Sequence, residues 1–255
     1  MKLHTYIIHL KTSKQRYNYM INLLEKYNFL EYEFIDAIDG RKASLDYLEE
    51  KFDYRESFKR YGRTLNKGEV GCTLSHRKSY EHLVCSNNNY ALILEDDISI
   101  IRDLNIICDL NIDSLMNTPK ATILFLSGDY WFWEKGNNIP SVYSAVGAYA
   151  YIINKAAANV ILTKKAFTVA DDWDYIKTYN IRYFAIRPYL IDANLNMDIL
   201  STDVKQDQWG VKKNNMGFYY LMRTLILQLT KQVLHYCHHF ESKIRVIDNK
   251  VVTEK

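Results

Sequence analysis

The sequence predicts an α/β domain built on a doubly wound, mostly parallel sheet of the Rossmann type, followed by an amphipathic C-terminal helix. Three observations predict this class. The chain opens with an apolar, an amphipathic and a second apolar stretch, the order of a strand–helix–strand unit. A later apolar run at 90–94 is typical of a buried central strand and ends in three acids. The last long periodic segment, 218–240, carries an apolar stripe at helical spacing.

Composition narrows the class of protein further. The 255 residues are 48% hydrophobic and 25% charged, which excludes a disordered chain, a collagen-like chain and a coiled-coil rod. Lys+Arg 33 against Asp+Glu 30 leaves a net charge of +3, too small to make nucleic acid the main partner. We see no signal peptide and no membrane-spanning stretch. The four cysteines form no CxxC pair, so we expect reduced thiols in a cytoplasmic protein and no zinc site.

The first half of the chain supplies three expected strands and two main helices. The strands cover 3–10, 31–40 and 90–100, and the helices cover 14–28 and 69–85. Ser13 is the expected N-cap of the first helix. The polar stretch 41–68 is expected to be a mobile excursion with one short helix near 45–51.

The second half repeats the alternation. We expect an apolar strand followed by an aromatic loop at 122–133, a strand at 141–155, helices at 155–167 and 171–179, a last strand at 182–191 and a loop at 192–217. The helix 218–240 should place its stripe against the core: Leu221, Met222, Leu225, Ile226, Leu229, Val233, Leu234 and Cys237. We expect a catalytic domain at 1–204 and a basic, helical extension at 205–255 that packs on it.

The acids after the run 90–94 are the sharpest chemical feature. In an open parallel sheet, ligands bind beyond the carboxyl ends of the strands. Glu95 and Asp97 are two residues apart, so both can face one crevice. Crowded carboxylates repel each other unless a cation lies between them, and Mg²⁺ or Mn²⁺ completes its shell with phosphate oxygens. The pattern therefore indicates a metal-bound nucleotide diphosphate; an acidic helix start or a solvated turn is the alternative.

Five segments resemble glycosyltransferase family 25, the bacterial lipooligosaccharide galactosyl- and glucosyltransferases with collagen galactosyltransferases as relatives. GEVGCTLSHRKSY (68–80) followed by ALILEDD (91–97) resembles the paired motif of that family. The other segments are TYIIHLKTSKQRY (5–17), FIDAIDGR (34–41) and GAYAYIINKAAANVIL (147–162), so the resemblance covers roughly residues 3–200.

The resemblance implies a GT-A-type fold that binds a UDP-sugar with Mn²⁺ or Mg²⁺. The acids then correspond to the DxD motif of that fold, with Asp97 as the principal metal ligand and Glu95 in the first Asp position. Asp96 or Glu95 would contact the ribose or a metal-bound water. Thr5, Tyr6, Ile7 and Ile8 would lie where the uridine docks, and Glu69 and His76 would lie on the helix beside the pocket, where a structural role is the alternative.

The family is inverting, which requires a carboxylate base on the side of the sugar opposite to UDP. The matching segment is DDWDY (171–175), and we favour Asp172 as the base, with Asp171 and Asp174 as rivals and Asp129 as a further candidate. The alternative is that these acids only begin a helix. Trp131, Trp133 and Trp173 are candidates for an acceptor-sugar platform, with core packing as the alternative.

Together these features predict a metal-dependent transferase that moves a hexose, most favourably galactose, from a UDP-sugar to a terminal sugar of lipooligosaccharide. From Lys205 to Arg245 the chain has seven Lys/Arg and two Asp/Glu, which suits contact with an anionic membrane. We favour closure of the core by the helix, and both roles are compatible if different faces carry them. Two other functions stay open: a Mg²⁺-dependent phosphatase or nucleotidyl enzyme, and a non-catalytic membrane-surface binding module.

Overall fold

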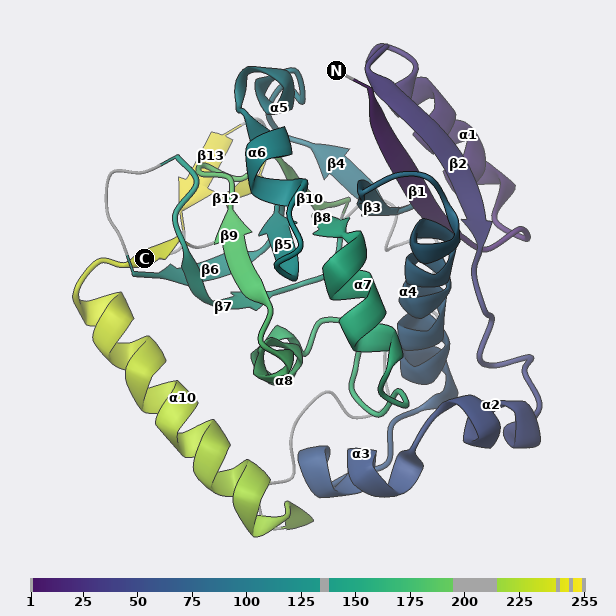
Figure 1. Cartoon of the computed structure of the whole chain (residues 1–255), viewed down its shortest axis with the longest axis vertical. Coiled ribbons are helices and arrows are strands. Elements are labelled where there is room, and N and C mark those ends of the chain that lie inside the picture. Colours follow the sequence, from purple (N-terminus) through teal and green to yellow (C-terminus); the bar gives the residue numbers. More distant parts are fainter. Residues whose placement is uncertain (1, 134–137, 195–214, 242–243, 248–249, 254–255) are drawn as a thin grey trace.

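A six-stranded sheet forms the centre of the protein. The computed structural model describes residues 2–133, 138–194, 215–241, 244–247 and 250–253. The strand order is β2-β1-β3-β8-β5-β9, from β1 (Leu3–His9), β2 (Leu30–Asp36), β3 (Tyr90–Glu95), β5 (Thr122–Phe125), β8 (Ala150–Asn154) and β9 (Arg182–Ala185). Only β8 runs antiparallel to its sheet neighbours. The expected mostly parallel α/β class is therefore confirmed (Figure 1).

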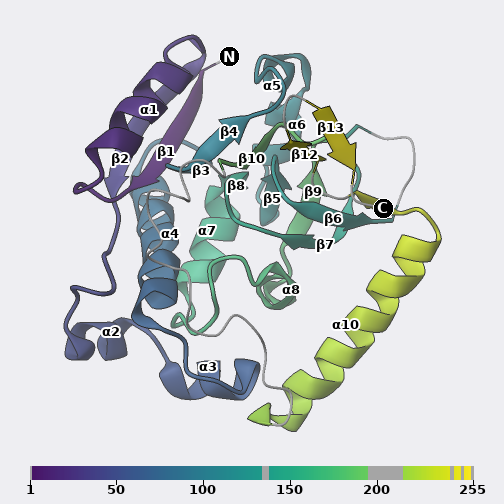
Figure 2. The ribbon, with the colours of Figure 1, turned by 180° about the vertical axis from the view of Figure 1, so that it is seen from behind.

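Helices cover both faces of this sheet because its strands are apolar on both sides. Leu92 and Leu94 of β3 pack toward α1 (Lys14–Leu24), α5 (Ile106–Asp109) and α6 (Ile112–Met116). Ala91 and Ile93 pack toward α4 (Lys67–Cys85), α7 (Lys155–Leu162) and α8 (Trp173–Ile176). Successive strand residues point to opposite faces, so one short apolar run feeds two cores. Figures 1 and 2 show this doubly wound arrangement from both sides.

The excursion between β2 and α4 contains two helices where the sequence analysis expected one. The predicted helix is α2 (Leu45–Lys51), and α3 (Tyr54–Tyr61) follows it. The side chain of Asp53 caps α3 by accepting from the Glu56 amide, and Gly62 ends it with φ 65°. Helix α4 begins at Lys67, with a capping box between Asn66 and Glu69.

Two predictions in the middle of the chain were wrong in detail. The aromatic segment after β5 is not a loop but strand β6 (Asp129–Phe132), and the strand expected at 141–155 is two strands, β7 (Val142–Val146) and β8. The breaks lie at Gly128 (φ +121°) and Gly147 (φ +91°). A Cβ at Gly128 would lie 2.1 Å from the carbonyl oxygen of Val146, so only glycine fits there. Strands β6, β7 and β11 (Phe240–Glu241) form a second sheet.

The segments after β8 are shorter than expected. Helix α7 ends at Leu162 rather than at 167, and α8 continues into a 3₁₀ turn, Lys177–Tyr179. Strand β9 ends at Ala185, and β10 (Ile191–Ala193) pairs with β4 (Ile98–Ile100). Strands β12 (Ile244–Ile247) and β13 (Lys250–Thr253) pair with each other. Most of the loop expected at 192–217, and the expected domain boundary at 204/205, lie outside the described residues.

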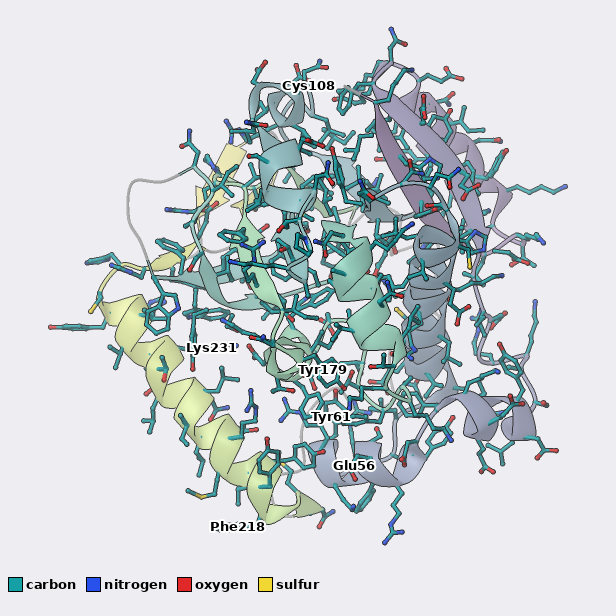
Figure 3. All side chains as sticks on the ribbon, viewed as in Figure 1. Glu56, Tyr61, Cys108, Tyr179, Phe218 and Lys231 are labelled. Atoms are coloured by element: carbon teal, nitrogen blue, oxygen red, sulfur yellow. The ribbon has the colours of Figure 1, made fainter. Side chains whose placement is uncertain are left out.

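Helix α10 (Phe218–Tyr236) corrects the expectation that its apolar stripe faces the core. From that stripe only Leu234 is buried; Met222, Leu225, Ile226, Leu229 and Val233 are exposed. The charged side chains of the helix point inward instead: Arg223 donates to the Asp174 carbonyl, and Lys231 pairs with the Asp174 carboxylate at 3.1 Å. Figure 3 shows Lys231 on the body side of the helix. Within the described ranges, no helix has the length and hydrophobicity that crossing a bilayer requires.

Candidate active site

The acids after β3 lie beside the carboxyl end of the parallel strand β1, whose Ile8 is in register with Glu95. His9, the last residue of β1, hydrogen-bonds through Nδ1 to Asp96 Oδ2 at 2.6 Å. Arg16 Nη1 donates to Asp96 at 2.7 Å and to Asp97 at 2.9 Å. Burial lowers the pKa of Arg16, but the two carboxylates outweigh burial and the pKa is raised. Arg16 therefore stays cationic and holds Asp96 and Asp97 in place.

Glu95 contacts α4. His76 Nε2 lies 3.1 Å from Glu95 Oε1, and His76 Nδ1 lies 2.8 Å from the Tyr151 hydroxyl. The imidazole is only 1% exposed and stacks on the Tyr151 ring. The Tyr151 hydroxyl in turn is 2.6 Å from that of Tyr80. This chain of buried hydrogen bonds fixes the orientation of His76 and, through it, of Glu95.

Asp171, in the segment before α8, lies within electrostatic reach of Glu95. Burial raises the pKa of Asp171, and the neighbouring charges of Asp172 and Glu95 raise it further. The backbone amides of Asp171 and Gly147 act in the opposite direction but do not cancel the rise. A carboxyl group held this way takes up a proton more readily than an exposed aspartate does.

Four carboxylates act on the Tyr149 hydroxyl. Burial raises the pKa of this hydroxyl, and the carboxylates of Glu95, Asp171, Asp97 and Asp192 raise it further, in that order. These four acids come from the end of β3, from the segment before α8 and from β10. The fold therefore gathers negative charge at the carboxyl ends of the central strands, where open α/β sheets bind their ligands.

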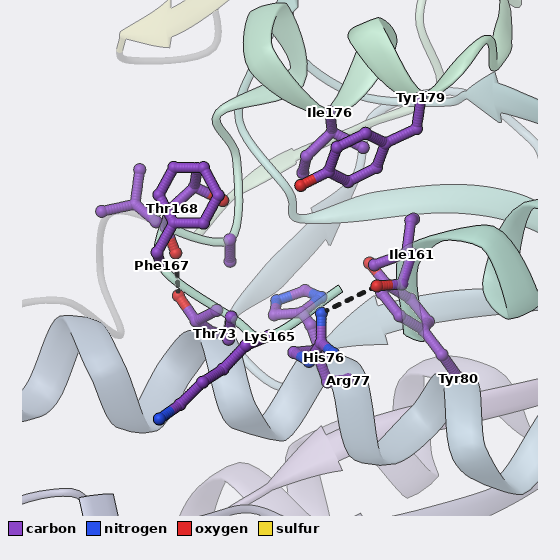
Figure 4. A pocket seen from close by; sticks show the side chains of 13 residues that line it. Thr73, His76, Arg77, Tyr80, Ile161, Lys165, Phe167, Thr168, Ile176 and Tyr179 are labelled. Atoms are coloured by element: carbon purple, nitrogen blue, oxygen red, sulfur yellow. Dashed lines mark hydrogen bonds between the residues drawn. The ribbon is translucent and has the colours of Figure 1, made fainter. Parts of the chain in front are cut away.

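A tightly packed segment positions Asp171. Residues 165–170 lie against α4, where Thr73 Oγ1 donates to the Thr168 carbonyl at 2.9 Å. Arg77 Nη1 of α4 donates to the Ile161 carbonyl of α7, just before this segment, at 3.1 Å (Figure 4). The hollow left between them measures about 30 Å³, room for little more than a water molecule. Figure 4 shows His76 at its edge. This contact fixes the backbone that leads to Asp171.

Asp172, which the sequence analysis favoured as the base, has a different environment. Its carboxylate accepts from Arg60 Nε and Nη2, both at 3.0 Å, from the Tyr61 hydroxyl at 2.6 Å and from the Tyr175 amide at 3.2 Å. Arg60 Nη1 also donates to Thr224 of α10 at 3.2 Å. Figure 3 shows Tyr61 between α3 and α8. Asp172 is buried and joins three helices.

The two other candidate bases lie in surroundings of their own. The Asp174 carboxylate accepts from Ser144 Oγ at 2.5 Å and from Lys231 at 3.1 Å, so it ties α8 to β7 and α10. Asp129 is the first residue of β6. Burial is the main cause of the raised pKa values of Tyr130 and Tyr189, and the carboxylates of Asp129, Asp192 and Glu241 raise both values further. Glu69 forms the α4 capping box and a bidentate pair with Arg63, which holds the start of α4.

The residues expected to dock the uridine are sheet interior. Thr5, Tyr6, Ile7 and Ile8 are all buried within β1, so their side chains offer almost no exposed surface to a nucleotide. A hollow of about 440 Å³ opens instead just beyond β1 and β2, lined by His9, Lys11, Lys14, Tyr17, Asn18, Phe34 and Asp36. The rings of Tyr17 and Phe34 lie 4.4 Å apart on its wall. Aromatic rings and lysines there suit a base and a phosphate better than the interior of a strand does.

The three tryptophans do not gather into one platform. Trp173 is fully buried and donates to the Gly147 carbonyl at 2.7 Å, so its ring lies in the core. Trp131 lies beneath Lys231 and Phe240. Trp133 is 49% exposed and packs edge-on to Tyr143. Trp133 directly follows β6. It is four residues beyond Asp129, which corresponds to roughly 13 Å at the rise of a strand.

Sequence reasoning missed His9, Arg16, Tyr149 and the Arg60–Tyr61 pair. A signal for His9 existed, because the last residue of a parallel strand must lie beside the end of its neighbour. Arg16 lies on the first turn of α1, directly after β1, and the same rule brings it near. Arg60 and Tyr61 lie more than a hundred residues from Asp172, and nothing local connects them.

Comparison with known proteins decides the family. The model of glycosyltransferase family 25, described as an LPS biosynthesis protein family, matches residues 2–135, more than half of the chain. The chain belongs to glycosyltransferase family 25. A family 25 member from Aedes aegypti is 38% identical over 100 residues, which cover 37% of this chain and 16% of that protein. A Haemophilus influenzae protein named as a glycosyltransferase is 26% identical over 201 residues, 70% of this chain and 66% of that one.

Other family 25 relatives match over a similar part. Human procollagen galactosyltransferase 2 is 29% identical over 98 residues, 36% of this chain and 15% of its own length. The matched part of this chain thus spans about a sixth of the length of these two animal relatives. Among solved structures, a UDP-glucose pyrophosphorylase bound to UDP-glucose covers 90% of this chain and all of its own at a TM-score of 0.41 and 7% identity. So distant a likeness carries no functional argument.

Proposed function

We propose that the protein transfers a hexose, most favourably galactose, from a UDP-sugar to a terminal sugar of lipooligosaccharide, with inversion at the anomeric carbon. One observation carries the proposal: Asp171, a carboxyl with a raised pKa, faces Glu95 and the other acids at the end of β3. Membership of family 25 supports glycosyl transfer in general. The donor, the acceptor and the stereochemistry are proposals from the site.

The donor set in the crevice fits a hard divalent cation. Glu95, Asp97, Asp171 and Asp192 all act on the Tyr149 hydroxyl, and carboxylate oxygens are the ligands that Mg²⁺ and Mn²⁺ prefer. Asp97 and Glu95 would hold the ion, which when bound supplies positive charge against the departing diphosphate. Arg16 and His9 keep Asp96 and Asp97 oriented. The hollow beside His9, with Lys11, Lys14 and Tyr17, would hold the nucleotide.

Asp171 takes the role of base in this proposal, in place of Asp172. The acceptor oxygen forms a bond to the anomeric carbon while the bond from that carbon to the diphosphate oxygen breaks. The acceptor hydroxyl proton passes to the Asp171 carboxylate, and UDP leaves with the electron pair. The raised pKa of Asp171 makes it a better proton acceptor at this step. Trp133 would contact a sugar of the acceptor further from the bond that forms.

A turnover assay tests this function against its rivals. The full chain is incubated with UDP-galactose, UDP-glucose and a truncated oligosaccharide, with Mn²⁺ or with a chelator, and products are identified by NMR. We expect transfer from one UDP-hexose that the chelator abolishes. A phosphatase would release phosphate from simple monoesters without preference for UDP, and a binding module would give no turnover; either result overturns the proposal.

We also propose that the outer face of α10 contacts a membrane surface, which would bring the enzyme to a lipid-linked acceptor. That face is apolar over the whole helix: Phe218 and Tyr236 at its ends are 77% and 86% exposed, and Met222, Ile226 and Leu229 lie between them. The extension from Lys205 to Arg245 is basic. A helix of this kind lies in the headgroup region rather than across the bilayer.

Flotation with anionic phospholipid vesicles tests the membrane contact. The parent chain should float with the vesicles. The double variant Ile226→Glu, Leu229→Glu should stay at the bottom, because it places charge on the apolar face. Gln232→Glu, at an exposed polar position of the same helix, is the matched control and should float. Failure of the parent to float, with self-association in solution instead, would assign this face to a second copy of the chain.

A further inference from the structure

A cysteine, a histidine and a glutamate converge between α4 and the end of β3. One ligand atom each from Cys72, His76 and Glu95 lies within 4.8 Å of the other two. Cys72 and His76 are four residues apart on α4 and so share one face of the helix, while Glu95 ends β3. The sequence analysis expected no zinc site because no two cysteines form a CxxC pair. The fold builds this cluster from a single cysteine.

We propose that Cys72, His76 and Glu95 bind one Zn²⁺ ion, with a fourth position left to water or to an oxygen of a ligand. A thiolate, an imidazole and a carboxylate are the three kinds of side chain that bind zinc in proteins, and three protein ligands with one open position are typical of exchangeable sites. Mg²⁺ and Mn²⁺ favour oxygen, so the cysteine distinguishes this cluster from the carboxylates around Tyr149.

Groups behind the cluster are arranged as the supporting shell of a metal ligand. His76 Nδ1 is 2.8 Å from the Tyr151 hydroxyl, which is 2.6 Å from the Tyr80 hydroxyl. If Nδ1 donates its proton to Tyr151, then Nε2 presents its lone pair on the side of Glu95. A second ring nitrogen held by a hydrogen bond is the usual arrangement of a metal-bound histidine.

The charge around the cluster favours a cation. Burial makes the largest contribution to the raised pKa of the Cys72 thiol. The nearby carboxylates raise this pKa further, in the order Glu95, Asp171, Asp97 and Glu69. The same negative potential that disfavours a bare thiolate attracts a divalent ion, and an ion between sulfur and Glu95 would stabilise the thiolate directly. Binding of Zn²⁺ would release the thiol proton to solvent.

Glu95 belongs both to this cluster and to the proposed donor site. Zn²⁺ on Cys72 and His76 would therefore draw Glu95 away from the diphosphate side, and zinc should inhibit transfer in competition with Mn²⁺. This consequence rests on the proposed function, whereas zinc binding itself does not. Measuring binding in the absence of nucleotide separates a failure of one from a failure of the other.

The test measures Zn²⁺ affinity of the metal-stripped full chain by competition with a chromophoric chelator, with no nucleotide present. The parent should bind one Zn²⁺. Cys72→Ser and His76→Gln should each weaken binding more than Tyr151→Phe, which removes only the supporting hydrogen bond and should cost about 10–100-fold. Cys85→Ser and His82→Gln, at exposed positions of the same helix, are matched controls and should bind like the parent. Equal affinity of Cys72→Ser and the parent would overturn the proposal.

Cobalt substitution gives a second readout that needs no change at the cluster. Cys85, Cys108 and Cys237 are exposed, so their triple replacement by serine should fold and leaves Cys72 as the sole thiol. Co²⁺ added to this variant should give the thiolate-to-metal absorption band and tetrahedral d–d bands, and Zn²⁺ should abolish both. If the thiolate band is missing in the triple variant, Cys72 is not a ligand and the site does not exist as proposed.

Discussion

Asp171 and Asp172 are adjacent in sequence but lie in opposite environments. Asp172 is bound by Arg60 and Tyr61 and caps α8, so its oxygens are committed to the fold. Asp171 is half-buried. Burial and the charges of Asp172 and Glu95 all disfavour its charged form. A carboxylate whose oxygens are hydrogen-bonded to a guanidinium stays ionised and stabilises the fold. A carboxylate that lies near other acids has a raised pKa and takes up a proton more readily. In the proposed function, Asp171 therefore acts as the base, whereas Asp172 holds the fold together.

The two aspartates also differ in what they do for stability. Because the folded-state pKa of Asp171 is raised, its neutral form is the one the fold favours. The stability that neutral Asp171 contributes is complete at pH values below the pKa that this side chain has in the unfolded chain. This stability is lost as the pH rises through the higher pKa of Asp171 in the folded state. At neutral pH, ionisation of Asp171 therefore lowers the free energy of unfolding.

The largest expected effect is on transfer in Asp171→Asn. Loss of the base should lower the rate by about 10²–10⁴-fold while UDP affinity stays at the parent value, because a base acts only in the displacement. Steady-state transfer and calorimetric UDP binding measure the two quantities. Asp109→Asn, an exposed surface change, is the control. Transfer at the parent rate would return the role of base to another acid, with Asp129 next.

Asp172→Asn should instead unfold the protein more easily. It leaves the Arg60 guanidinium buried without its carboxylate, which costs about 3–5 kcal/mol, or roughly 6–20 °C in melting temperature. Thermal unfolding followed by circular dichroism measures this. If the variant melts like the parent and loses transfer, the comparison is reversed and Asp172 is the base after all.

The pH dependence sharpens the assignment further. Transfer should fall as the pH drops through the pKa of Asp171, and this inflection should lie above the value of about 3.9 for an exposed aspartate. Glu95→Gln removes one of the charges that raise this pKa, so its inflection should move to lower pH even though its rate is reduced. The pH–rate profiles of the parent and of Glu95→Gln measure the two inflections. An inflection at the same pH in both would mean that the charge of Glu95 does not act on the residue that titrates.

The smallest expected effect is a gain in stability. Asp171→Asn removes a half-buried carboxyl whose ionisation opposes folding at neutral pH, so we expect about 0.5–2 kcal/mol of stabilisation and a higher melting temperature. The gain should shrink as the pH falls toward the range where the parent aspartate is neutral. Melting curves at several pH values measure it. A variant less stable than the parent at neutral pH would mean that charged Asp171 has favourable contacts.

Sequence periodicity was sufficient for the central sheet and for the place of the acids. The buried runs at 3–9 and 90–95 are strands, and the parallel order puts their carboxyl ends together. What sequence reasoning could not supply was partner choice over long separations. Arg60 pairs with Asp172 and not with Asp171. Which of these two adjacent acids receives the arginine depends on the folded chain and not on the local sequence. The exposed stripe of α10 was missed for a related reason: periodicity identifies an apolar face but not what lies against it.

Calorimetric titration of UDP, with Mn²⁺ and with a chelator, tests most directly whether the acids after β3 hold a metal-bound diphosphate. The parent and Asp109→Ala should bind UDP more tightly when Mn²⁺ is present. Asp97→Ala should fold but lose this metal-dependent gain, because it removes the proposed principal ligand. Metal-dependent UDP binding that survives in Asp97→Ala would contradict the account at its centre.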